Sequence, residues 1–147
     1  MIRVPVHQLD PELPLPTYAK PGDAGVDLYA RGDVLLGHGG GRSLVPTGIV
    51  VAVPQGYAGL VLPRSGLALA HGVSCLNTPG LVDSGYRGEL SVLLINTDPV
   101  EDYQVRRGDR VAQFVIQSVE TLTLLTQSLD ALPASERATG GFGHSGR

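Results

Sequence analysis

The sequence of 147 residues contains no tryptophan, one cysteine and one methionine, and aromatic residues make up only 5% of it. The core must therefore be built mainly from valine, leucine and isoleucine. Because Cys75 is alone, no disulfide can form within the chain, and no cluster of cysteines can hold a metal ion. Cys75 lies in the apolar stretch GVSCLN, so we expect a buried, unreactive thiol.

Long apolar runs are also missing. No stretch of about 18 apolar residues is present, as a membrane-spanning helix would require. The first ten residues, MIRVPVHQLD, lack the apolar segment of a signal peptide. We therefore expect a soluble, cytoplasmic protein without a membrane partner.

The formal net charge is −3, so the sequence carries no overall positive charge of the kind that nucleic acids attract. We expect no nucleic-acid polymer as a partner. Ten of the eleven basic residues are arginine, which forms forked contacts with the phosphates of smaller anions. The same excess of arginine is also typical of a GC-rich genome.

Short stretches that favour β-structure alternate with proline and glycine along most of the chain, and this spacing predicts one all-β domain, a sandwich or barrel. Both faces of the last two long stretches are apolar, which suits a sandwich interior or a subunit interface. Only residues 65–71 predict a helix, with Ser65 as its cap and Gly72 as its end. The predicted strands lie within IRVPVH, GVDLYA, SLVPTGIVVAV, AGLVL, GELSVLLINT and DRVAQFVIQSVE.

Two short stretches in the first half of the chain carry candidate functional groups. In PGDAGVDLYA, Asp23 belongs to a turn, whereas Asp27 interrupts an apolar strand and faces either solvent or a cation or water. In LPRSGLA, Arg64, Ser65 and Gly66 form either an anion-binding cradle or an ordinary helix start beside a surface arginine. No GxxxxGK[ST] motif is present, so a P-loop is excluded.

The stretch LNTPGLVDSGYRGEL predicts a β-hairpin with its turn at residues 78–80. Asp83 is either a turn residue or a carboxylate that can take a proton from water. Without regard to the other motifs, we expect Tyr86 to be an aromatic residue of the core. On the same basis we expect Gln113, further along in GDRVAQ, to be an amide whose hydrogen bonds are satisfied within the fold.

Together and in this order, five stretches resemble the motifs of the trimeric dUTP pyrophosphatase (dUTPase) family. They are AGVDLYA, PRSGLA, GLVDSGYRGEL, GDRVAQ and the terminal RATGGFGHSG, and they extend over nearly the whole chain. The resemblance implies a homotrimer of jelly-roll subunits, with each active site assembled from all three chains. It also implies hydrolysis of dUTP to dUMP and pyrophosphate with Mg²⁺ on the triphosphate.

The resemblance assigns a role to each matching residue. Asp83 is the general base, and Asp27 holds magnesium through water. The residues that contact the nucleotide are Arg64, Ser65, Gly66 and Gln113 at the phosphates, Asn77 and Gly80 at uracil, Tyr86 at the deoxyribose, Arg137 at the terminal phosphate, Phe142 stacked on uracil, and the neighbouring Gly143, His144 and Ser145.

These assignments divide the chain into a β-domain, residues 1–130, and a flexible glycine-rich arm, residues 131–147, that folds over bound nucleotide. The arm departs from the family pattern at Ala138 and His144. Two alternative functions are a dCTP deaminase of the same fold and a non-catalytic trimer that senses nucleotides. The PRSGLA stretch and the Asp83, Arg64 and Arg137 set disfavour both of them.

Overall fold

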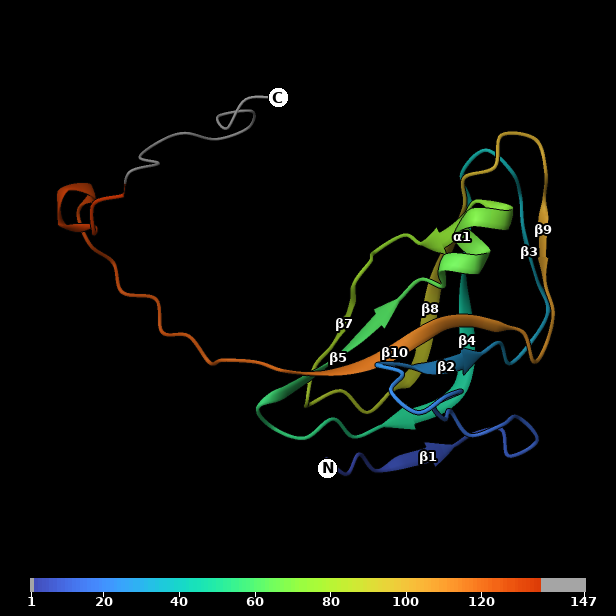
Figure 1. The fold of residues 1–147 in the computed structure, drawn as a ribbon, viewed down its shortest axis with the longest axis horizontal. Coiled ribbons are helices and arrows are strands. Elements are labelled where there is room, and N and C mark those ends of the chain that lie inside the picture. Colours follow the sequence, from blue (N-terminus) through green and yellow to red (C-terminus); the bar gives the residue numbers. More distant parts are fainter. Residues whose placement is uncertain (1, 136–147) are drawn as a thin grey trace.

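The computed structural model describes residues 2–135 (Figure 1), which form ten strands, one α-helix and one 3-10 turn. The strands are β1 (Val6–Gln8), β2 (Val26–Tyr29), β3 (Val34–Leu36), β4 (Gly41–Val51), β5 (Tyr57–Leu62), β6 (Val73–Cys75), β7 (Gly80–Val82), β8 (Glu89–Asn96), β9 (Tyr103–Val105) and β10 (Arg110–Ser118). The helix is α1 (Ser65–His71), and the 3-10 turn is η1 (Leu129–Ala131). The prediction of a mostly β protein with one short helix is confirmed.

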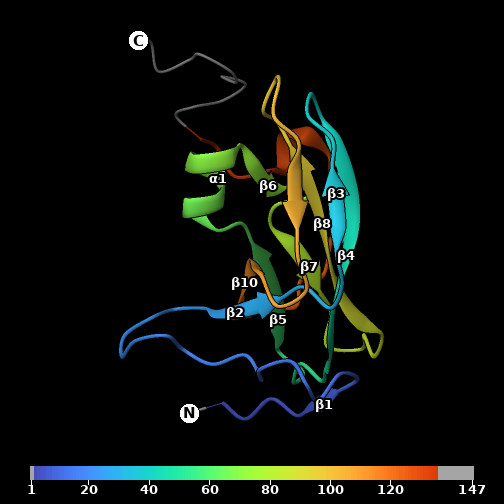
Figure 2. The same ribbon diagram turned by 90° about the vertical axis from the view of Figure 1, so that its right-hand side faces the viewer.

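The strands form two four-stranded sheets and one two-stranded ribbon, and every recorded pair is antiparallel. One sheet has the order β1-β4-β8-β6 and the other the order β2-β10-β5-β7, while β3 pairs with β9. The two larger sheets lie against each other (Figure 2), and neither closes into a barrel within residues 2–135. Each of the six predicted strand stretches overlaps a strand.

A single apolar core lies between the two sheets. In β8, Leu90, Val92 and Leu94 are buried and alternate with half-buried residues, as the two-residue period of a strand requires. Leu28 of β2 belongs to the same buried cluster from the opposite sheet. Cys75 is also buried, as expected, and its desolvation raises the pKa of the thiol to about 11.

Helix α1 spans the predicted residues and ends as expected at Gly72, which adopts a left-handed conformation with φ of 63°. The predicted cap is wrong. Arg64 occupies the cap position with extended backbone angles, and Ser65 is the first helical residue. No side chain caps the helix, because the side chain at the cap position is an arginine that turns toward another strand.

The predicted hairpin is also wrong. Strand β6 pairs with β8 in one sheet, whereas β7 pairs with β5 in the other. Residues 76–79 do form a turn, but it carries the chain from one sheet to the other. Alternation of apolar residues identifies a strand without identifying its partner.

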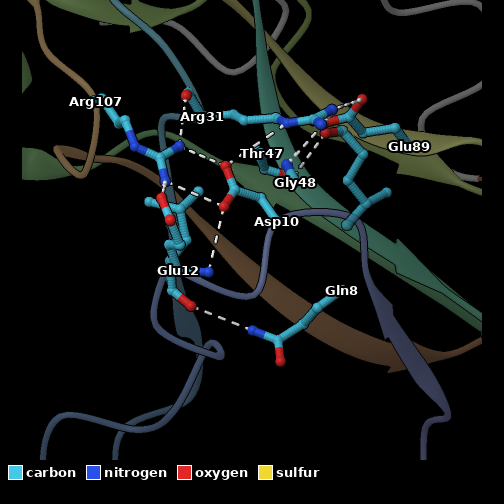
Figure 3. A network of polar contacts seen from close by, with 10 residues as sticks. Gln8, Asp10, Glu12, Arg31, Thr47, Gly48, Glu89 and Arg107 are labelled. Atoms are coloured by element: carbon cyan, nitrogen blue, oxygen red, sulfur yellow. Dashed lines mark hydrogen bonds and ion pairs between the residues drawn. The ribbon is translucent and has the colours of Figure 1, made fainter.

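A network of charged side chains fastens the N-terminal segment to the sheets (Figure 3). Arg107 donates hydrogen bonds to both carboxylate oxygens of Asp10 and, at 3.1 Å, to Glu12 Oε2. Arg31 lies 3.7 Å from Asp10 and 3.4 Å from Glu89. The hydrogen bond from Arg107 holds the pKa of Asp10 below its ordinary value.

Among residues 2–135, no helix combines the length and apolar character needed to cross a membrane.

Candidate active site

Asp27 lies at the centre of a group of side chains from β2, β10 and the loop after β5. Its side chain is 11% exposed, and each of its carboxylate oxygens accepts a hydrogen bond from a different arginine. Arg64 Nε lies 3.0 Å from Oδ1, and Arg110 Nη1 lies 3.3 Å from Oδ2. Of the two alternatives for Asp27, a carboxylate on an exposed strand edge is therefore wrong.

Sheet register places Gln113 beside Asp27. Gln113 of β10 is directly opposite Asp27 of β2 on one side and Leu62 of β5 on the other. A hollow of about 330 Å³ is lined by Asp23, Asp27, Leu62 and Gln113, among others. Because Arg64 follows Leu62 by two residues, β5 delivers its side chain to Asp27, which lines this hollow. Gln113 is exposed rather than packed in the core.

A bulge in β10 sets which side chains line this hollow. The sheet register shifts between Arg110 and Ala112, so Val111 is buried together with Ala112. Strict alternation in the sequence places Val111 on the same face as Gln113, and that prediction is wrong. The bulge turns Val111 into the core and leaves Arg110 beside Asp27.

Asp23 forms the turn that the sequence predicts. Its carboxylate accepts a 2.7 Å hydrogen bond from the backbone N–H of Lys20, and its own N–H donates to the Lys20 carbonyl. This turn closes the loop before β2 and shapes one side of the Asp27 hollow.

A second hollow, of about 310 Å³, contains Asp83 and Tyr86. Its apolar lining includes Leu44, Leu81 and Leu90. Asp83 is exposed, and no hydrogen bond to its carboxylate is found among residues 2–135. The turn here is closed by the backbone, because the N–H of Tyr86 donates to the carbonyl of Asp83 at 3.1 Å, so an Asx turn is wrong. The carboxylate therefore remains available to a ligand.

Tyr86 is a surface residue of the second hollow, and 44% of the residue's surface is exposed. Its hydroxyl donates a 2.9 Å hydrogen bond to the carbonyl of Glu89. The ring packs over Gly88, where an added Cβ would lie 2.4 Å from the hydroxyl oxygen. The alternative of a core aromatic is wrong, and the ring is held in one orientation at the edge of the hollow.

Asn77 and Gly80 lie at the two ends of the turn between β6 and β7. Asn77 is exposed, and Gly80 pairs with Val61 of β5. A Cβ at Gly80 would lie 3.4 Å from the amide nitrogen of Asn77 and 3.2 Å from Val61 Cβ. The glycine therefore leaves space for the asparagine side chain beside β5.

The two hollows lie at different ends of β5. Leu62 marks the Asp27 hollow, whereas Gly59, three residues earlier, pairs with Val82, the neighbour of Asp83. Asp83 therefore lies level with Ala58, four residues from Leu62. Four residues span about 13 Å, and the three strand spacings from β2 to β7 add roughly 14 Å at right angles. Asp27 and Asp83 of one chain are thus separated by roughly 19 Å along the sheet.

Among residues 2–135, no three histidine, cysteine, aspartate or glutamate side chains are grouped closely enough to hold a metal ion. The Asp27 hollow does offer hard oxygen donors, namely the carboxylates of Asp23 and Asp27 and the amide of Gln113. Magnesium commonly binds proteins through one or two carboxylates and keeps its remaining positions for water and substrate phosphates. The donor set of the hollow fits magnesium held in that way.

The structure thus brings Asp27, Arg64 and Gln113 together and Asp83 and Tyr86 together. Ser65 and Gly66 follow Arg64 as the first residues of α1, and both are exposed. No role at the site was predicted for Arg110 from the sequence. Its position at the start of a predicted strand was the one feature that drew attention to it. The remaining predicted residues lie outside the described part of the chain: Arg137, Phe142, Gly143, His144 and Ser145.

Comparison with known proteins agrees with these motifs. The family profile for dUTPase matches residues 11–146. The deoxyuridine 5'-triphosphate nucleotidohydrolase of Thermobifida fusca is 52% identical over 99% of this chain and 79% of its own length. The enzyme of the same name from Mycobacterium marinum is 55% identical, covering 96% of this chain and 93% of its own length.

Among solved structures, the dUTPase of Staphylococcus bacteriophage 80alpha with dUPNHPP has a TM-score of 0.86 and 25% identity, covering all of both chains. The match in fold accompanies the match in sequence over the same residues. The chain belongs to the dUTPase family.

Proposed function

We propose that this protein hydrolyses dUTP to dUMP and pyrophosphate, with Asp83 activating the water that attacks the α-phosphorus. The reaction limits uracil incorporation into DNA and supplies dUMP for thymidylate synthesis. One observation carries this proposal: motifs of the dUTPase family fold into two hollows, one with Asp27, Arg64 and Gln113 and the other with Asp83.

Asp83 suits the role of general base. Its carboxylate lies in a hollow, is exposed, and is not engaged by the turn around it. A positioned base contributes about 10²–10⁴ in rate when it lies within hydrogen-bond reach of the proton that it takes. Asp83 therefore orients and deprotonates a water molecule in line with the bond between the α- and β-phosphates.

Arg64, Ser65, Gly66 and Gln113 grip the phosphate chain. The exposed amide of Gln113 lines the same hollow as Asp27, and the guanidinium of Arg64 contacts Asp27, so both supply donors that match phosphate oxygens. Asp27, with Gln113 opposite it, is the residue that would hold magnesium through the water shell of the ion. When bound, magnesium neutralises negative charge on the departing pyrophosphate.

The turn at residues 76–80 recognises uracil, with Asn77 at its start and Gly80 at its end. Fixed backbone donors and acceptors discriminate against cytosine, because a mismatched base leaves buried polar groups unpaired. Tyr86 packs against the deoxyribose. The hydrogen bond from its hydroxyl to Glu89 holds the ring in place, so a 2′-hydroxyl finds no room.

The active protein is a trimer of jelly-roll subunits whose sites combine residues from different copies. The general base and the phosphate grip must act on the same phosphate chain, yet Asp83 and Asp27 of one copy are roughly 19 Å apart. Apolar side chains that a partner would cover are exposed around the second hollow and along the segment after β10, which extends away from both sheets (Figure 1). They are Leu44, Leu81, Leu122, Leu124, Leu125, Leu129 and Leu132.

The terminal arm, residues 131–147, closes over the nucleotide of a neighbouring copy in the cytoplasmic enzyme. Arg137 then contacts the terminal phosphate and Phe142 stacks on uracil, with Gly143, His144 and Ser145 alongside. Groups that fold on binding gain contacts that offset the loss of chain entropy. The arm therefore makes closure depend on bound substrate.

A pyrophosphate-release assay with dUTP tests this function, using dCTP and UTP as competing substrates. We expect release from dUTP alone, and a loss of about 10²–10⁴ in kcat for Asp83→Asn. The matched control is Glu101→Gln, an exposed carboxylate between β8 and β9. Undiminished turnover by Asp83→Asn would refute the assignment of the base, and release from none of the nucleotides would refute the function.

A further inference from the structure

Asp27 is the one charged residue among residues 2–135 that is buried. Each of its two carboxylate oxygens accepts one hydrogen bond, Oδ1 from Arg64 and Oδ2 from Arg110. Each oxygen keeps a second lone pair that a water molecule of hydrated magnesium can use, but the two guanidinium charges repel the cation. Withdrawal of one arginine therefore favours magnesium at Asp27.

The two arginines are placed differently. Arg64 belongs to the loop between β5 and α1, and its side chain also donates from Nη1 to the carbonyl of Arg110 at 3.2 Å. Arg110 is anchored in the ladder between β10 and β2, opposite Tyr29, and contacts Asp27 at 3.3 Å. The Arg64 side chain is the more enclosed of the two, 23% exposed against 50% for Arg110, but Arg64 directly precedes Ser65 and Gly66, where the proposed function locates the phosphates. Arg64 is thus the arginine that a phosphate chain can draw away.

We propose that Arg64 exchanges between Asp27 and the nucleotide phosphates, and that Arg110 is a positioning residue that holds Asp27 when Arg64 leaves. This inference rests on the proposed function, because it needs the phosphate chain of dUTP at the Asp27 hollow. Every charge keeps a partner during the exchange: Arg64 gains phosphate oxygens, and Asp27 keeps Arg110 and faces the hydrated magnesium ion. Leaving one partner of an enclosed ion pair alone is strongly unfavourable, so a concerted exchange is the favoured route.

The exchange couples the two ligands. Without magnesium, Asp27 competes with the phosphates for Arg64 and weakens nucleotide binding. Magnesium at Asp27 relieves this competition, so it strengthens nucleotide binding beyond its direct contact with phosphate. Coupling is reciprocal, and typical coupling between two ligands changes affinity by about 5–150-fold.

Calorimetric titration with α,β-imido dUTP in magnesium-free buffer tests the competition. We expect Asp27→Asn to bind this analogue about tenfold more tightly than the unaltered protein, because Arg64 is released. Removing a carboxylate also reduces its repulsion of phosphate, so the substitution is repeated in an Arg64→Gln background. The exchange predicts that the gain there falls below about twofold, because the two residues act through one contact. The exchange would be overturned if Asp27→Asn raised analogue affinity equally with Arg64 and with Gln at position 64. It would also be overturned if Asp27→Asn did not raise the affinity when Arg64 is present.

Arg110→Gln tests the positioning role in the same titration. Asp27 then depends on Arg64 alone, so we expect analogue affinity to fall about tenfold, with recovery in Arg110→Lys. In the Arg64→Gln background, Arg110→Gln should lower analogue affinity by less than about twofold, because Arg64 is no longer there to exchange. The control is Arg106→Gln, which removes the same charge from a nearby exposed position. The positioning role is overturned if Arg110→Gln behaves like this control, or if its loss is equal in both backgrounds.

Pyrophosphate release from dUTP by the unaltered protein is measured alongside. Absence of release would refute the proposed function itself. Release together with independent, additive effects of Asp27 and Arg64 would refute only the exchange. Urea unfolding of each variant shows that the compared proteins are folded.

Discussion

Gly59 of β5 lies where a methyl group cannot be added without displacing its neighbours. A Cβ built there would lie 2.4 Å from Cε2 and 2.5 Å from Cζ of Phe114, and 3.2 Å from Cβ of Val82. Phe114 is buried in the core, and Val82 is the last residue of β7, directly before Asp83. Gly59→Ala therefore pushes the core on one side and the strand that leads to Asp83, the proposed general base, on the other.

The expected loss of stability follows from two opposing contributions. Overpacking of a well-packed core costs about 1–3 kcal/mol. Replacing glycine by alanine within a strand returns about 0.5–1 kcal/mol, because the unfolded chain has less freedom to lose. We expect a net decrease of about 1–2 kcal/mol in the free energy of unfolding. Because a misplacement of about 1 Å near reacting groups can cost about 10²-fold in rate, kcat should also fall at least tenfold.

Urea unfolding at one fixed protein concentration measures the first effect, since association makes apparent stability depend on concentration. The matched control is Phe114→Leu, alone and combined with Gly59→Ala. The smaller side chain makes room for the new methyl group, so the double variant should be more stable than the sum of the single effects predicts, by at least about 0.5 kcal/mol. A Gly59→Ala protein as stable as the unaltered one, or strictly additive effects, would refute this packing argument.

Two further predictions concern ionisable groups. Asp10→Asn should lower the free energy of unfolding at pH 7, because the pKa of Asp10 is lower in the folded protein than its value of about 3.9 in the unfolded chain. The stabilisation by the ionised Asp10 is complete above about pH 3.9 and is lost as the pH falls through the folded pKa. A stability difference that persisted unchanged to pH 2 would contradict this. Burial and a raised pKa should protect Cys75 from iodoacetamide at pH 8 in the folded protein but not in urea, and rapid labelling of the folded protein would contradict it.

Features set by neighbouring residues could be predicted from the sequence. Helix α1 and its end at Gly72 follow from local signals, and so do the six predicted strand stretches. Strands β3 and β9 were not predicted, although β1, which is equally short, lies partly in a predicted stretch. Local signals also failed at the bulge beside Val111, where one extra residue reverses the face that a side chain occupies.

Features set by distant residues could not be predicted in this way. Strands β6 and β7 adjoin in the sequence but join different sheets, and spacing alone does not reveal this. Asp27 meets Arg64 and Arg110 across 37 and 83 residues. Resemblance to a family identified Asp27 and Arg64 as functional residues, but the ion pairs between them and with Arg110 emerged only from the fold.

The most direct test of the account mixes two inactive variants, Asp83→Asn and Arg64→Gln, by unfolding and refolding them together. Each site of the proposed trimer takes Asp83 from one copy and Arg64 from another. In trimers that form at random from an equal mixture, about one site in four then has both Asp83 and Arg64 unaltered. We therefore expect the mixture to recover about a quarter of the dUTP hydrolysis of the refolded unaltered protein. A mixture no more active than the two variants refolded separately would contradict a site shared between copies.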